Sequence, residues 1–157
     1  KIYLTCLCLF MILMAKSQSD FVVGESEGTL FIEHQLQEHE TLQSLSQYYL
    51  VRPGAIQKLN GLEMNQWPTV KEFIRIPLSE TNFIKVRPAD ASANIHALHF
   101  MLGSSDNLKS LSELLFISQE TLKKLNPESQ FRRGELVLMG WMNIYGLPQK
   151  NVSVPSR

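Results

Sequence analysis

The chain has 157 residues, of which 15 are basic and 15 are acidic, so its formal net charge at pH 7 is zero. A nucleic-acid-binding protein normally presents a basic field, and this balance argues against that class. Both cysteines, Cys6 and Cys8, lie near the N-terminus, so the rest of the chain contains no disulfide framework.

An apolar run from Ile2 to Ala15 follows Lys1 and precedes small and polar residues. A basic start, an apolar core and a small-residue cleavage region are typical of a secretory signal peptide, here residues 1–17. The run is shorter than the about 20 residues of a membrane span, and an uncleaved anchor is the alternative. Removal takes away two basic residues and no acidic one, leaving 13 basic and 15 acidic residues. We expect an exported protein, in the periplasm or at the cell surface, that meets the membrane only through this peptide.

The remaining chain contains an internal repeat with an offset of 66 residues. Residues 42–60 and 108–126 align without a gap, and seven of the nineteen positions are identical. The identical residues lie in two motifs, Leu42–Ser46 with Leu108–Ser112 and Lys58–Asn60 with Lys124–Asn126. A repeat of this length predicts two small modules rather than one large fold.

The first module, residues 30–79, is predicted to run strand, helix, helix, strand. Thr41 offers a hydroxyl that caps a helix N-terminus, and Pro53 suits the first position of a second helix. Asn60 precedes a glycine, which is a helix stop signal. Apolar and β-branched residues predict the two strands, at 30–36 and 73–77.

The second module, residues 95–142, repeats this order. Ser118 is a good cap for its second helix, which ends at Asn126 before a proline, and a closing strand follows at 135–139. Two strands with two helices on one face make a compact two-layer unit. The expected fold class is therefore α+β, with two small βααβ modules joined by a linker after a signal peptide. The other segments are an N-terminal segment, the linker, and a tail or further linker, at 18–29, 80–94 and 143–157.

The ordered set of motifs resembles the LysM domain. In the first module it comprises His39–Leu42, Leu45–Ser46, Tyr49–Val51, Ile56–Asn60 and Ile74–Pro77. In the second module it comprises Ser105–Leu108, Leu111–Ser112, Leu115–Ile117, Leu122–Asn126 and Gly134–Leu138. The resemblance covers most of both modules. The tandem, exported and cysteine-free arrangement is similar to LysM proteins of Bacteroidota envelopes.

This resemblance implies non-catalytic binding of a glycan that contains N-acetylglucosamine, usually peptidoglycan and in some lineages chitin. The ligand of a LysM domain lies in a shallow groove between the turn before the first helix and the turn after the second. Carried over, the first groove comprises His39, Glu40, Thr41, Leu42, Asn60, Gly61 and Leu62. The second groove comprises Ser105, Asp106, Asn107, Leu108, Asn126, Pro127 and Glu128. Neither first turn has the Gly-Asp-Thr that is usual in the family.

Several of these residues also have a structural explanation. Thr41 and Asn107 are expected to act first as helix caps. Asn60 and Asn126 are expected to end their helices and to tie the following loops through side-chain bonds to the backbone. Trp67, in a long loop, either stacks on a sugar ring or packs that loop onto the module.

No enzyme or metal site is expected. His96 and His99 are three residues apart, which places their rings on opposite faces of a strand, and no cysteine or carboxylate pair completes a metal set. Glu38 and Glu40 lie on a predicted turn rather than in a cleft, which argues against a glycosidase pair. We expect no catalytic residue, no metal and no cofactor.

Two further functions stay open. Modules with altered first turns can keep the fold without the sugar groove and serve as a scaffold for envelope proteins. Alternatively, the chain is the targeting arm of a cell-wall enzyme whose catalytic domain lies beyond residue 157. Nucleic acid is not an expected partner.

Overall fold

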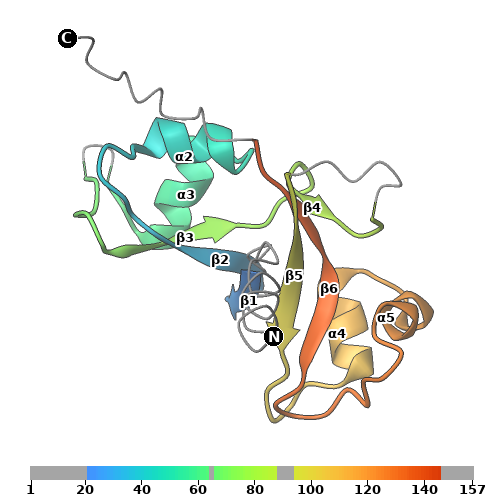
Figure 1. The fold of residues 1–157 in the computed structure, drawn as a ribbon. Coiled ribbons are helices and arrows are strands. Elements are labelled where there is room, and N and C mark those ends of the chain that lie inside the picture. The colour runs from blue at the N-terminus through green and yellow to red at the C-terminus, as the bar shows by residue number, and fades with distance from the viewer. Residues whose placement is uncertain (1–20, 64–65, 88–93, 146–157) are drawn as a thin grey trace, which may run out of the picture.

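The computed structural model describes residues 21–63, 66–87 and 94–145, which form one sheet with helices on it (Figure 1). The sheet has six strands in the order β3-β2-β1-β5-β6-β4. The strands are β1 (Phe21–Ser26), β2 (Thr29–Gln35), β3 (Phe73–Pro77), β4 (Phe83–Ile84), β5 (Ile95–Met101) and β6 (Leu136–Asn143). The helices are α2 (Leu42–Tyr48), α3 (Pro53–Asn60), α4 (Leu108–Leu115) and α5 (Gln119–Leu125). The predicted signal peptide lies outside the described residues.

The prediction of two small, separate modules joined by a linker is wrong. The strands of both repeats belong to the same sheet, because β1 pairs antiparallel with β2 and parallel with β5. β1 comes from the segment before the first predicted module and lies outside the repeat, so the repeat did not reveal this central strand. A two-stranded sheet is marginal alone, and β1 supplies each strand pair with a further neighbour.

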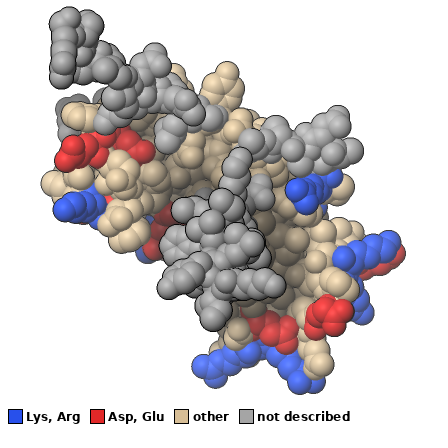
Figure 2. Space-filling view, in the orientation of Figure 1, with Lys and Arg blue, Asp and Glu red and all other residues tan. Residues whose placement is uncertain are grey.

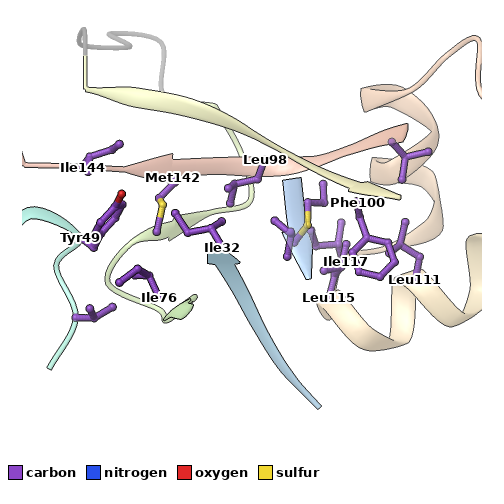
Figure 3. Close-up of a cluster of buried hydrophobic side chains, with 14 of the residues drawn as sticks. Ile32, Tyr49, Ile76, Leu98, Phe100, Leu111, Leu115, Ile117, Met142 and Ile144 are labelled. Atoms are coloured by element: carbon purple, nitrogen blue, oxygen red, sulfur yellow. The ribbon is translucent and has the colours of Figure 1, made fainter. Parts of the chain in front are cut away.

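The hydrophobic core is shared between the repeats. A single cluster of buried side chains runs from Tyr49 and Ile76 in the first repeat to Leu111 and Leu115 in the second (Figure 3). Leu98 lies between the two ends and is fully buried. The molecule therefore folds around one core, with α2 and α3 over β2 and β3, and α4 and α5 beside β5 and β6 (Figure 1).

The segment predicted to be a linker takes part in the sheet. Phe83 and Ile84 of β4 pair with Met142 and Trp141 of β6. Their close approach requires Gly140, which has φ of +152°, because a Cβ there would lie 2.7 Å from the Ile84 carbonyl oxygen. Asn82, just before β4, is fully buried. The described residues at the start of the predicted linker, 80–87, thus include a structural part of the fold.

Helix starts agree with the caps predicted from sequence. The Thr41 hydroxyl accepts a hydrogen bond from the Ser44 N–H at 3.1 Å, and the Asn107 side chain accepts from the Ser110 N–H at 3.1 Å. The Ser118 hydroxyl accepts from the Thr121 N–H at 3.1 Å. Such caps satisfy backbone donors that have no partner within the helix.

The first repeat contains a cluster of three partly buried or buried polar side chains, Tyr49, His34 and Glu40, at the border of its core. The Tyr49 hydroxyl lies 2.7 Å from His34 Nδ1, and His34 Nε2 lies 2.6 Å from Glu40 Oε2. Burial is the main cause that raises the pKa of the Tyr49 hydroxyl well above its usual range, and the neighbouring Tyr48 and Glu40 add to the effect. The Tyr49 hydroxyl therefore stays protonated. Sixty-six residues later, Phe100 and Leu115 occupy the positions of His34 and Tyr49, and both are buried.

Candidate functional site in the second repeat

The second repeat has a cavity of about 620 Å³ between the start of α4 and the segment that follows α5. Four of the seven residues predicted for this groove line it, namely Asn107, Leu108, Asn126 and Pro127. The lining is completed by residues that the sequence analysis did not single out, namely Lys109, Gln119, Lys123, Ser129, Gln130 and Phe131. The structure thus brings the two predicted turns to one hollow.

Two of the predicted polar groups in this cavity are already engaged within the fold. The Asn126 amide donates to the carbonyls of Leu122 and Leu138 at 3.0 and 2.8 Å, and its oxygen accepts from the Leu138 N–H at 2.7 Å. The Asn107 oxygen accepts from two backbone N–H groups of α4. These side chains shape the walls rather than present free donors.

The loop on the far side of the cavity is fixed by one carboxylate. Glu135 Oε2 accepts from the Ser129 hydroxyl at 2.5 Å and from the N–H groups of Gln130 and Phe131 at 3.0 and 3.1 Å. The Ser129 hydrogen bond is the main cause that lowers the pKa of Glu135, with the backbone N–H groups adding to it. The ionised carboxylate therefore holds Gln130 and Phe131 in place at the cavity wall.

Free polar groups in the cavity come from residues outside the predicted motif. Neither the Gln119 nor the Gln130 side-chain amide has a hydrogen-bond partner among the described residues, and both residues are exposed. Lys109 and Lys123 add two ammonium groups. Gln119 and Lys123 are four residues apart on α5, a spacing that places both on one face of the helix and that was visible in the sequence.

An apolar surface lies beside these groups, formed by Leu108, Pro127 and Phe131. Phe131 is buried in the core cluster and has a φ of 55°, which turns the loop at this point. A cavity with amide and ammonium groups next to an apolar wall suits a ligand that carries hydroxyl, amide and methyl groups.

The other three predicted residues of the second groove do not line this cavity. Asp106 Oδ2 accepts from the Gly103 N–H at 2.7 Å and closes the turn before α4. Ser105 is exposed on the same turn. Glu128 borders a separate hollow, next to Glu135 and Leu136.

The first repeat arranges its predicted groove differently. Glu40, equivalent to Asp106, accepts from the Gln37 N–H at 2.9 Å and is also bound by His34. His39 has a φ of 69°, which is unusual for a residue with a side chain. Asn60 repeats the pattern of Asn126, donating to the carbonyls of Ile56 and Arg75 at 2.7 Å each.

The Trp67 side chain lies against the turn that contains Glu40, which is one side of the groove predicted for the first repeat. Its indole N–H donates to the Glu40 carbonyl at 3.2 Å, and its side chain packs against the core. Leu62 borders a hollow with Trp67, and Thr41, Leu42, Asn60 and Gly61 are not part of its lining. Of the two explanations weighed for Trp67, its contacts correspond to packing the long loop onto the fold.

Within residues 21–63, 66–87 and 94–145, no group of three His, Cys, Asp or Glu side chains is placed to hold a metal ion. No helix in these ranges is long and apolar enough to cross a membrane.

Comparisons with known proteins leave the family undetermined. No protein-family model matches the chain, and no curated protein sequence matches it. Among solved structures, the chain is similar to one described as the "Crystal structure of the ectodomain of a receptor like kinase", with 15% identity and a TM-score of 0.30. That match covers 75% of this chain and 60% of the other.

Proposed function

We propose that the cavity of the second repeat binds a glycan that contains N-acetylglucosamine, in the envelope of a bacterial cell, without catalysing a reaction. The observation that carries this proposal is the pair of free amides, from Gln119 and Gln130, beside the apolar surface of Leu108 and Phe131. Amides pair with sugar hydroxyl and acetamido groups, and the apolar surface accepts the acetamido methyl. The motif resemblance to LysM domains points to the same ligand class.

Only the second repeat is proposed to bind. In the first repeat, the Trp67 indole bonds to the Glu40 carbonyl, on the turn where the ligand was expected. The hollow beside Trp67 contains one glutamine, Gln66, and its side-chain oxygen already accepts from the Glu63 N–H at 3.3 Å. The first repeat therefore serves as a scaffold that completes the shared sheet and core, and the binding stoichiometry is one glycan site per chain.

Steric blocking of the cavity tests this function. Gln119→Trp places an indole at the cavity wall, and Gln47→Trp places the same group on an exposed position of α2 as a control. We expect the natural protein and Gln47→Trp to pellet with insoluble peptidoglycan, and Gln119→Trp to remain in the supernatant. If the natural protein stays in the supernatant at low salt, or if both variants pellet equally, the proposal is wrong.

A further inference from the structure

We infer that the cavity of the second repeat selects a glycan that carries carboxylate groups over a neutral glycan of the same sugar. This inference rests on the proposed function and specifies the class of ligand. It starts from Lys109 and Lys123, which both line the cavity, whereas none of its lining residues is acidic.

The two ammonium groups are available to a ligand. Lys123 has no carboxylate partner among the described residues. Lys109 lies 3.9 Å from Glu113, and both side chains are largely exposed, so this ion pair contributes little. The neighbouring Lys124, in contrast, is paired with Glu120 at 2.7 Å and does not line the cavity.

The charge is local to the cavity rather than a property of the whole face. Figure 2 shows basic and acidic side chains interspersed over the part of the surface that α4 and α5 form. The first repeat has glutamines, Gln43 and Gln57, at the positions equivalent to Lys109 and Lys123. The hollow beside Trp67 is lined by Glu72 and has no basic residue. The two lysines of the cavity therefore have no counterpart in the hollow beside Trp67, although Arg52 and Lys58 line a separate hollow of the first repeat, next to the end of β3.

The two lysines suit a ligand that carries carboxylates to pair with them. Peptidoglycan carries carboxylates on its sugars or attached peptides, whereas chitin is neutral. Two exposed ammonium–carboxylate pairs contribute about 0.2–1 kcal/mol each, or about 0.4–2 kcal/mol together, which corresponds to a roughly twofold to thirtyfold preference at low salt. Because exposed charges are screened beyond about 10 Å at 0.1 M salt, the preference is expected to shrink as salt rises.

The test compares binding of the purified protein to insoluble peptidoglycan and to insoluble chitin, each in low and in high salt. The double variant Lys109→Gln/Lys123→Gln gives the cavity the residues of the first repeat. The control Lys58→Gln/Lys124→Gln removes the same charge from two equivalent positions outside the cavity.

We expect the natural protein to bind peptidoglycan about twofold to thirtyfold more tightly than chitin at low salt. The cavity variant is expected to lose this preference and still bind chitin, while the control keeps it. Equal binding of both glycans, or an equal loss in the control, overturns the inference and leaves the proposed function intact. Binding to neither glycan overturns both.

Discussion

Replacing Asn82 by alanine is expected to lower the free energy of unfolding by about 3 kcal/mol, since it leaves several buried backbone groups without partners. The Asn82 amide donates to the carbonyls of Tyr49 and Pro77 at 2.9 and 3.2 Å, and its oxygen accepts from the Ser79 N–H at 2.7 Å. The Asn82 backbone carbonyl accepts from the Asn143 N–H at 2.8 Å. One fully buried residue thus joins α2, the end of β3 and β6.

Urea unfolding followed by circular dichroism measures this effect. Thr81→Ala is the matched control, because Thr81 is the exposed neighbour of Asn82. We expect a change of less than about 0.5 kcal/mol for the control. A change as small as this for Asn82→Ala would contradict the role given to the segment between the repeats. Since the core is shared, both variants should unfold in one transition.

The second large effect concerns the asparagines of the repeated motif, Asn60 and Asn126. Each side chain makes three hydrogen bonds that join the end of a helix to the closing strand of its repeat. Replacing either one by alanine is expected to destabilise the fold by about 2 kcal/mol, because partly buried carbonyl and N–H groups lose their partners. Denaturant unfolding of the two variants under the same conditions provides the comparison.

The two asparagine variants are expected to differ in glycan binding. Asn126 lines the cavity and positions the segment that contains Pro127, so Asn126→Ala should weaken binding to peptidoglycan. Asn60→Ala should bind like the natural protein under conditions where both variants are folded. Equal loss of binding in the two variants would show that stability, and not the second cavity, controls binding.

Local structure was largely predictable because it depends on nearest neighbours in the sequence. The Thr41 and Ser118 caps, the Pro53 helix start and the strand at 73–77 were all predicted, and the structure has them at these positions. The structural role expected for Asn60 and Asn126 is also observed. Caps, turn residues and apolar periodicity act over a few residues and leave a direct signal in the chain.

The arrangement of the repeats was not predictable in this way. Pairing of Val22 with His99 in the β1–β5 ladder joins residues 77 positions apart, and no local pattern specifies such a partner. Residues 80–94 were predicted to be a linker because residues 87–94 are small and polar, yet Asn82 and β4 near its start belong to the fold. The repeat covers only residues 42–60 and 108–126, so it carried no information on β1 and β4, which lie outside it.

The candidate site was predicted in outline. Two turns were expected to form a groove, and the structure places Asn107, Leu108, Asn126 and Pro127 around one cavity. The two free amides were missed, because Gln119 lies on the first turn of α5 and Gln130 lies in the loop held by Glu135. The difference between the repeats follows from the longer loop of the first, which carries Trp67 to the Glu40 turn.

The central claim is that one glycan site exists and that it lies in the second repeat. Titration of the ¹⁵N-labelled protein with an N-acetylglucosamine oligomer, followed by amide NMR spectra, tests it most directly. The account predicts shifts at Gln119, Lys123 and Gln130, with the side-chain amides of both glutamines included, and no shift at Glu40 or Trp67. Shifts confined to Glu40, Trp67 and their neighbours, or no shift at millimolar oligomer, would contradict it.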